Sequence, residues 1–379
     1  MINVSEPLVT ELDVRLIEDA ARSGWISSAG RFIDEFEQGW AEYCGRSYGV
    51  AVSSGTAALQ VAVTALDLNE GDEVIMPTFT IISCALAVVQ AGGVPVLVDC
   101  DPRTWCMDVA QVEAKVSERT RAIMPVHIYG HPVDMDPLLD IAARHNLAII
   151  EDAAEAHGAR YQRDRGEQDA HWAKCGSFGT MSCFSFYANK LITTGEGGMI
   201  LTDDPSIAAT ARSLRNLCFE PGRRFRHERL GFNFRLTNLQ AALGVAQLSR
   251  IEEIVERKRW LGQTYSEHLG GLAGVQLPVE EPWAKSVYWM YGVVIDETYG
   301  PATAVADALR ERHGVDTRPF FLGMHQQPAL RHLDLSDTGE FPVADRIAEQ
   351  GLYLPSGVGL TEEQVAEVCE SVRSVLTDG

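Results

Sequence analysis

Lysine is scarce in this sequence, and so is net positive charge. Five of the 32 basic residues are lysines, and the acidic residues outnumber the basic ones to give a formal net charge of −21. This excess of negative charge argues against a general affinity for nucleic acid or for an anionic membrane surface. An anionic ligand would need a place where arginines are concentrated. A lysine between a run of aromatic residues and a loop of threonines and glycines therefore needs an explanation.

Long apolar runs and paired cysteines are also missing. No apolar run approaches the roughly 18 residues that a membrane helix needs, and the opening "MINVSEPLVTELDV" has neither the basic start nor the apolar segment of a signal peptide. The eight cysteines form no CxxC pair and no metal-ligand spacing, so we expect buried, reduced thiols. These absences predict a cytoplasmic protein without a metal site.

Apolar strands alternate with amphipathic helices through roughly the first 215 residues. This alternation predicts an α/β fold with a mostly parallel sheet, helices on both of its faces, and a ligand beyond the carboxyl ends of the strands. The expected strands are 48–53, 72–77, 94–99, 122–127 and 147–152, and the expected helices are 11–24, 31–45, 54–66, 80–91, 106–116 and 134–145.

The pattern changes in the last third of the chain. A continuous helical pattern over 237–269 is followed by strand, helix, strand and helix patterns at 287–295, 302–314, 315–321 and 361–376. We therefore expect a large α/β domain, 1–250, and a smaller α+β domain, 251–379. The first ten or so residues are expected to pack on the smaller domain.

Three polar signals lie where expected strands end. Asp152 closes the apolar run "LAIIED", Ser54 and Thr56 open a helix after a strand, and Lys190 follows Ser185 in "FSFYANKLITTGEGG". Each alone has an ordinary interpretation: a helix cap or turn aspartate, a capped helix start, and a solvated loop lysine. The functional interpretations are a paired carboxylate, a phosphate site at a helix N-terminus, and a lysine without a nearby acid whose pKa is lowered.

Together these signals match the needs of pyridoxal 5′-phosphate. A neutral lysine amine forms a Schiff base with the aldehyde of the cofactor, and a helix start holds its phosphate. A carboxylate keeps the pyridine nitrogen protonated, so that the ring accepts electrons. Lys190 and Asp152 are the expected catalytic residues.

The motifs "SGTAAL", "EDAAEAHGA", "FSFYANK" and "TTGEGGMI" resemble, in this order and spacing, the DegT/DnrJ/EryC1/StrS family of sugar aminotransferases. The resemblance extends over essentially the whole chain and implies the aspartate-aminotransferase fold (fold type I). "VHIYGHPVDMDP", "GFNFRLTNLQAALGVAQL" and "YWMYGVVI" are most similar to members that aminate C4 of a GDP-linked 4-keto-6-deoxy-mannose, with L-glutamate as the donor, in deoxyamino sugar biosynthesis.

The resemblance also implies roles for individual residues. Lys190 would carry the cofactor and move the proton, Asp152 would face the pyridine nitrogen, and Glu155 would contact the ring hydroxyl. Asn233 would reach the phosphate from the neighbouring subunit, which implies a homodimer with shared active sites. The expected phosphate contacts are Gly55, Thr56, Ala57 and Ser185.

An arginine-rich segment is the expected contact for the nucleotide. Residues 212–235 contain seven arginines and two glutamates. Forked guanidinium groups suit a diphosphate, although a solvated face or salt bridges between subunits would explain the same composition. Arg223, Arg224 and Tyr187 are the expected substrate contacts. His227 and His325 are either further contacts or structural histidines.

The sequence departs from the family pattern at three places. Ile81 stands where relatives carry an aromatic that stacks on the cofactor, the polar segment 161–176 is longer than the usual hairpin, and "RRFRHERLGF" lacks an aromatic expected near the nucleotide. Alternatives therefore stay open: a dTDP- or UDP-linked 3- or 4-keto sugar or another keto-sugar as substrate, or a sensing protein without turnover. A dehydratase of the same fold is disfavoured, because such relatives replace the lysine with histidine.

Overall fold

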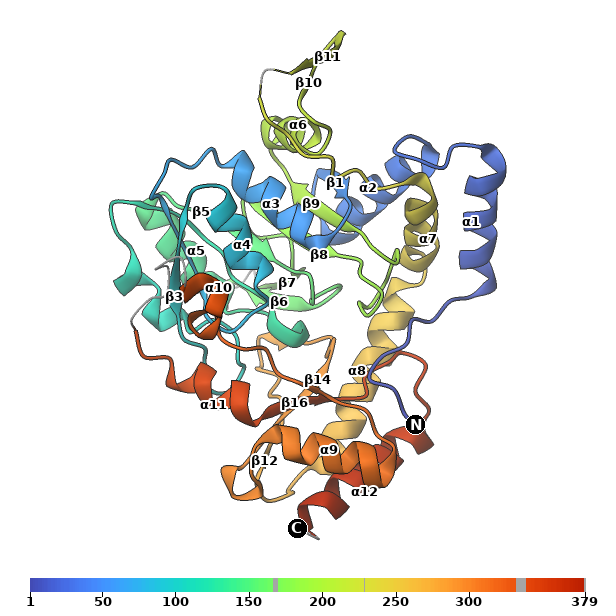
Figure 1. The fold of residues 1–379 in the computed structure, drawn as a ribbon, viewed down its shortest axis with the longest axis vertical. Helices are drawn as coiled ribbons and strands as arrows, with labels where there is room; N and C mark the ends of the chain where they lie inside the picture. Colours follow the sequence, from blue (N-terminus) through green and yellow to red (C-terminus); the bar gives the residue numbers. More distant parts are fainter. Residues whose placement is uncertain (166–169, 228, 332–338, 378–379) are drawn as a thin grey trace.

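A seven-stranded sheet forms the centre of the molecule in the computed structural model, which describes residues 1–165, 170–227, 229–331 and 339–377 (Figure 1). The strand order is β1-β9-β8-β5-β4-β2-β3. β2 runs parallel to β3 and β4, β4 to β5, and β5 to β8, whereas β9 is antiparallel to β8 and β1. The predicted α/β class with a mostly parallel sheet is confirmed. The bounds are β1 (Tyr48–Val52), β2 (Glu73–Pro77), β3 (Val94–Val98), β4 (Thr120–Ile123), β5 (Ala148–Asp152), β8 (Met181–Ser185) and β9 (Gly198–Thr202).

Three of the helices around this sheet begin or end at the residues that the sequence signals predict. Gly24 and Gly45 stop the first two helices in the left-handed conformation, with φ of 75° at each. Ser54 caps the third by accepting a hydrogen bond from the Ala57 amide. The bounds are α1 (Glu11–Ser23), α2 (Arg31–Cys44), α3 (Gly55–Ala65), α4 (Ser83–Gln90), α5 (Met135–His145) and α6 (Pro205–Leu214).

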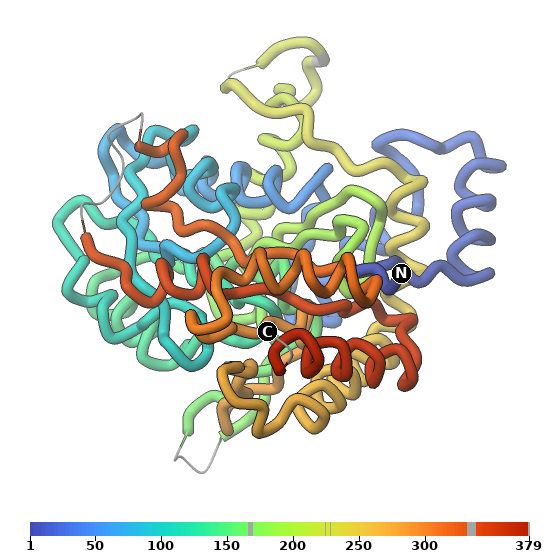
Figure 2. Tube along the Cα trace, turned by 60° about the horizontal axis from the view of Figure 1, so that its bottom comes forward, coloured from blue at the N-terminus to red at the C-terminus, as the bar shows by residue number. Residues whose placement is uncertain are grey.

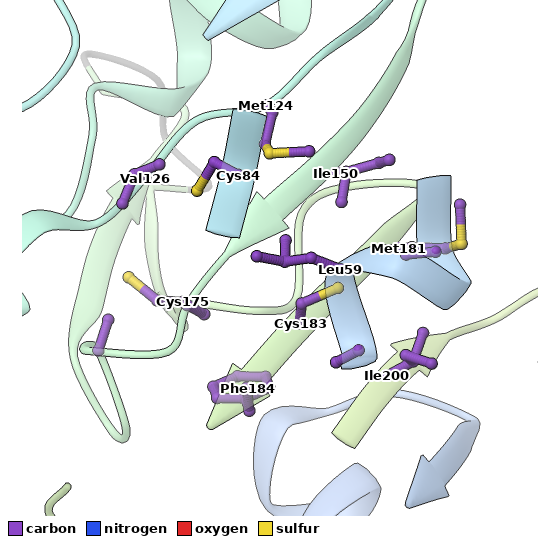
Figure 3. Close-up of a cluster of buried hydrophobic side chains, with 14 of the residues drawn as sticks. Leu59, Cys84, Met124, Val126, Ile150, Cys175, Met181, Cys183, Phe184 and Ile200 are labelled. Carbon is purple, nitrogen blue, oxygen red and sulfur yellow. The ribbon is translucent and has the colours of Figure 1, made fainter. Parts of the chain in front are cut away.

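The core between helices and sheet is a continuous cluster of buried hydrophobic side chains. Figure 3 shows Leu59 of α3, Ile150 of β5, and Cys183 and Phe184 of β8 in one cluster. All four side chains are buried, with exposed fractions of 2% or less. Burial of this kind supplies most of the stabilisation of such a layer and fixes the strand ends against α3 and α4.

Two predicted helices are wrong. Residues 106–116 contain only the 3₁₀ turns η1 (Val109–Gln111) and η2 (Glu113–Lys115). The continuous helix over 237–269 is divided into α7 (Asn238–Leu248) and α8 (Ile251–Leu269). A residue of α1 stabilises the break between the two helices, because the buried Asp13 accepts hydrogen bonds from the side chains of Gln247 and Arg250.

A second sheet of order β12-β14-β16-β15 has its own core with α8, α9 (Ala302–His313) and α12 (Glu362–Thr377), as the lower part of Figure 1 shows. Two of its strands, β14 (Tyr291–Ile295) and β15 (Arg318–Pro319), are shorter than the predicted 287–295 and 315–321. The other two, β12 (Val275–Gln276) and β16 (Gly351–Leu354), were not predicted. α8 belongs to both cores, since Ile254 packs in the first and Leu261 in the second. Ile2 pairs with Val315 beside this sheet. The domain boundary at 250/251 stays a prediction.

The remaining elements are peripheral. A hairpin projects from the body of the molecule near α6 and consists of β10 (Phe219–Glu220) and β11 (Arg223–His227) (Figure 1). β6 (Arg160–Arg163), β7 (His171–Lys174) and β13 (Ala284–Lys285) form a third sheet. Figure 2 shows α9 and α12 side by side in the foreground of the view turned by 60°. The other helices are α10 (Pro328–Arg331) and α11 (Pro342–Gln350). Among the described helices, none is long and apolar enough to cross a membrane.

Candidate active site

A cavity of about 300 Å³ lies where α3 begins and where β2, β5 and β8 end. The carboxyl ends of strands are where ligands bind in sheets of this type. A larger hollow of about 530 Å³ lies elsewhere; six of its fifteen lining residues are acidic and none is a lysine. The residues that line the first cavity include Gly55, Thr56, Ile81, Asp152, Glu155, Ser185, Tyr187 and Lys190. Eight residues predicted from four separate stretches of the sequence therefore surround one space.

Lys190 lies inside this cavity with 10% of its side chain exposed. Its Nζ is 3.6 Å from Glu155 Oε1 and 3.5 Å from the centre of the Trp289 ring. The expectation that no acid lies near Lys190 is wrong, because β5 and the turn after it bring Glu155 against the loop after β8. The expected lowering of the pKa of Lys190 is confirmed, since burial outweighs the opposing charges of Glu155 and Asp152.

Asp152 and its neighbour Glu151 have different surroundings. Asp152 lines the cavity, and its carboxylate accepts hydrogen bonds from Cys84 Sγ at 3.1 Å and from the Ala154 amide at 3.0 Å. A thiol is a weak donor, so this buried carboxylate retains the capacity to accept from a cationic ring N–H. Glu151 points away from the cavity and is fully buried. It accepts from His127 and from the amides of Gly176, Phe178 and Gly179.

The start of α3 has the form of an anion site. Ala57 donates its amide to the Ser54 side chain, so the amides of Gly55 and Thr56 remain without helical partners at the positive end of the helix. Ser185 stands directly opposite, because a Cβ on Gly55 would lie 2.7 Å from the Ser185 Cβ. The Thr56 hydroxyl lies 2.8 Å from the Ser83 hydroxyl. The site therefore fits a phosphate group. The Ala57 amide, which the sequence analysis also expects to contact the phosphate, already donates its hydrogen bond to Ser54.

Glu155 is held rigidly beside Lys190. Its Oε2 accepts a hydrogen bond of 2.8 Å from the Tyr129 amide, and Tyr129 has a φ of 50°, an uncommon conformation for a bulky residue. Burial raises the pKa of Glu155 to about 7, with Asp152 adding to the rise and Lys190 opposing it. The cavity thus combines an amine with a lowered pKa and a carboxyl with a raised one.

Other predicted residues lie outside this cavity. Arg223 and His227 are on the exposed hairpin, where Arg223 pairs with Glu220. Arg224 is in the same strand, but its side chain lies outside what the structure describes. Asn233 bridges Asn216 at the base of the hairpin.

His325 is engaged within its own chain. Its Nδ1 lies 2.7 Å from Thr78 Oγ1, and its Nε2 lies 2.8 Å from Asp345 Oδ1. The arginine segment is divided as well, since Arg212 and Arg215 pair with the buried Glu37 rather than facing a ligand. The substrate roles of the hairpin residues and of His325 remain predictions.

The structure adds cavity residues that the sequence reasoning missed. Trp289, Phe321 and Tyr353 come from the second unit and line the same cavity. Trp289 donates its indole N–H to the Asn189 carbonyl oxygen at 2.8 Å, which ties the second unit to the loop of Lys190. "YWMYGVVI" was a usable signal, but a strand pattern does not indicate which ring faces Lys190.

In the long segment 161–176, the described strands β6 and β7 pair with each other, and β6 also pairs with β13. None of its described residues lines the cavity. Residues 166–169, which the prediction of a cover for the site includes, lie outside the described residues.

Comparison with known proteins agrees with this geometry. Fold and site together define an aminotransferase of the aspartate-aminotransferase type. A sequence model of the DegT/DnrJ/EryC1/StrS aminotransferase family matches residues 7–373, and the chain belongs to this family.

Individual relatives match over nearly their full length. GDP-perosamine synthase of Caulobacter vibrioides is 43% identical over 99% of this chain and 98% of that protein. GDP-perosamine synthase of Vibrio cholerae is 36% identical over 99% of each. The crystal structure of the aminotransferase TlmJ from Streptoalloteichus hindustanus superimposes with a TM-score of 0.91 at 29% identity, covering 100% of this chain and 99% of that one. The predicted family, fold and enzyme class are confirmed.

Proposed function

We propose that this enzyme transfers the amino group of L-glutamate to C4 of GDP-4-keto-6-deoxy-mannose, with pyridoxal 5′-phosphate as cofactor. The observation that carries the proposal is the convergence of Lys190, Asp152 and the start of α3 on one cavity. The names of the two relatives, both GDP-perosamine synthases that match nearly all of this chain, support the choice of substrate.

The residues of the cavity suit that cofactor. When bound, pyridoxal phosphate supplies an aldehyde that reacts with amines and a ring that accepts electrons. The amides of Gly55 and Thr56 and the hydroxyl of Ser185 would hold its phosphate, and Asp152 would hold a protonated ring nitrogen. Ile81, which is 42% exposed, presents an aliphatic surface to the cavity in place of an aromatic ring.

Lys190 would do the acid–base work. Its Nζ lies at a buried position that lowers the pKa of the amine, so a proton would be taken up or returned at one fixed atom. Tyr187, half exposed at the cavity, would contact the sugar that brings the carbonyl carbon to this atom. Glu155 would lie toward the ring hydroxyl.

A homodimer with shared sites is part of the proposal. Among the residues whose side chains the structure describes, Arg223, His227 and Asn233 do not line the cavity of their own chain. On a projecting arm they suit contact with the nucleotide and phosphate in the cavity of a second copy. The arm carries Phe225 with 77% of its surface exposed, and an apolar ring at this position would suit contact with a partner. The cytoplasmic location stays a prediction, based on eight cysteines that are all free and buried.

The decisive experiment is a panel of nucleotide-linked keto-sugars incubated with glutamate and read by mass spectrometry. We expect amination of GDP-4-keto-6-deoxy-mannose at C4 and its loss, by at least roughly a thousandfold, in Lys190→Ala. If the enzyme prefers a dTDP- or UDP-linked sugar, the proposed substrate is wrong but the proposed transamination stands. Unreduced turnover in Lys190→Ala would disprove the mechanism, and no product with any sugar would favour a sensing protein.

A further inference from the structure

Glu155 has no role yet beyond an expected contact with the ring hydroxyl. Its carboxylate has one oxygen fixed by the Tyr129 amide and the other 3.6 Å from Lys190 Nζ. At 6% exposure it has little access to solvent, so Lys190 is the group with which it can exchange a proton. The distance is slightly longer than a hydrogen bond, and a small rotation of the lysine side chain closes it.

We infer that Glu155 is a catalytic residue that accepts the proton of Lys190 when the amine becomes neutral and returns it when the amine is recharged. This inference rests on the proposed function, because the neutral amine is the form that attacks a carbonyl carbon. The step is Lys190–NH₃⁺ + Glu155–COO⁻ → Lys190–NH₂ + Glu155–COOH. One N–H bond breaks, one O–H bond forms, and the pair keeps its total charge.

The surroundings of the pair favour this exchange. A raised pKa at Glu155 and a lowered pKa at Lys190 bring the charged and the neutral forms of the pair closer in free energy. The Trp289 ring opposes complete loss of charge at Lys190, since an aromatic face attracts a cation. Because Lys190 is largely buried, a nearby group rather than bulk water must accept its proton when the amine becomes neutral.

Other titratable groups face Glu155, but they do not serve as the acceptor. Burial raises the pKa of Tyr129 well above its ordinary value and that of Tyr353 to about 12, and it raises the pKa of the Cys84 and Cys106 thiols. These four groups therefore stay protonated near neutral pH. The remaining group, Asp152, already accepts hydrogen bonds from Cys84 and Ala154, and its negative charge favours the neutral form of Glu155.

The test measures the reactivity of the Lys190 amine rather than turnover. Holoenzyme is converted with L-glutamate, which frees Lys190, and is separated from glutamate by gel filtration. Trace acetylation with acetic anhydride over a range of pH, read by peptide mass spectrometry, gives a midpoint for Lys190. Lys285, which lies over the Trp172 ring, serves as the internal reference in every sample.

Glu155→Gln keeps the shape of the side chain and an acceptor for the Tyr129 amide, but it removes the negative charge. Loss of that charge at 3.6 Å should lower the labelling midpoint of Lys190 by about one to three pH units. Turnover should nevertheless fall, because the amide at position 155 can neither take up the proton that Lys190 releases nor return it when the amine is recharged. Faster labelling together with lower kcat distinguishes this role from a merely structural one, which would impair both.

Glu196→Gln is the matched control, because Glu196 is exposed and lines the same cavity. It should leave the midpoint unchanged. An unshifted midpoint in Glu155→Gln, or equal shifts in the two variants, overturns the inference. Failure of the proposed function would be seen separately, because glutamate would then not release Lys190 from the cofactor. In that case the cofactor is removed with phenylhydrazine and the labelling midpoint of Lys190 is measured on the cofactor-free protein. The inference about Glu155 is then judged by the same shift of the midpoint in Glu155→Gln.

Discussion

At the scale of residues, the neighbours Glu151 and Asp152 show how strand geometry assigns function. Successive side chains of a strand point to opposite faces of the sheet. Asp152 therefore enters the cavity, while Glu151 meets His127 and the turn that ends at Gly179 on the other side. Burial alone would raise the pKa of Glu151, but the hydrogen bond from His127 and the turn amides lower it instead. Glu151 is thus a structural carboxylate and Asp152 is free for a ligand.

The anion site at the start of α3 can be tested by adding one methyl group at Gly55. Gly55→Ala places a Cβ 2.7 Å from the Ser185 Cβ, so Ser185 and the start of α3 must separate. Loss of one charge-assisted hydrogen bond to phosphate should weaken binding of pyridoxal phosphate by roughly 10- to 100-fold. Titration of the cofactor-free protein, followed by fluorescence, measures this. Binding of pyridoxal, which has no phosphate, should change little.

The matched control for that substitution is Gly359→Ala. A Cβ on Gly359 meets no heavy atom within 4 Å, so this variant should bind pyridoxal phosphate as the unaltered protein does. Equal affinities of Gly55→Ala and Gly359→Ala for pyridoxal phosphate would show that the start of α3 does not bind the phosphate.

At the scale of elements, α8 joins the two cores through a buried lysine. Lys258 is 2% exposed, and its Nζ donates to the carbonyl oxygens of Trp289 and Ser356. Trp289 in turn faces Lys190 and binds the Asn189 carbonyl. The helix therefore carries a fixed contact from the second sheet to the loop of the candidate catalytic lysine.

Burial lowers the pKa of Lys258 to about 7, and this makes stability depend on pH. The unfolded chain has an ordinary lysine pKa of about 10.4, so between roughly pH 7 and 10 it binds one proton more than the folded chain at this site. The free energy of unfolding should therefore gain about 1.4 kcal/mol per pH unit from Lys258 as the pH rises. Below the folded pKa both states are protonated and the contribution to the slope vanishes.

Lys258→Met removes this contribution. Urea unfolding at pH 7, 8 and 9 should show a slope against pH that is smaller in the variant by about 1.4 kcal/mol per unit. Lys285→Met is the control, since Lys285 lies over the Trp172 ring in the third sheet and not between the two cores. Equal slopes in the unaltered protein and Lys258→Met would contradict the lowered pKa of Lys258.

At the scale of the whole molecule, the proposed shared site predicts complementation between two inactive variants. Lys190→Ala removes the amine from its own cavity, and Asn233→Ala removes the contact proposed to reach the partner's cavity. A heterodimer of the two would hold one site with both defects and one with neither, so about half of the dimer's activity should return. Purification through two different tags and light scattering establish the heterodimer and its mass.

A heterodimer of Lys190→Ala with Asp152→Ala is the matched control. Both residues line the cavity of the same chain, so each of its two sites lacks one of them and no activity should return. If the Lys190→Ala and Asn233→Ala pair is equally inactive, the sites are not shared in the proposed way.

Local physics determined much of this protein from the sequence alone. The short apolar runs that form the strands, the glycines that end α1 and α2, and the serine that caps α3 act within a few residues, so their positions follow from neighbouring letters. The family motifs were sufficient to indicate Lys190, Asp152, Thr56 and Ser185, and all four line one cavity.

Only the tertiary structure decided which distant groups meet. Glu155 lies 35 positions before Lys190, and Trp289 lies in the other unit, so no local pattern places either beside the amine. The break between α7 and α8 likewise depends on Asp13 of α1. The packing of the chain sets such contacts, because it brings side chains together without regard to their separation in sequence.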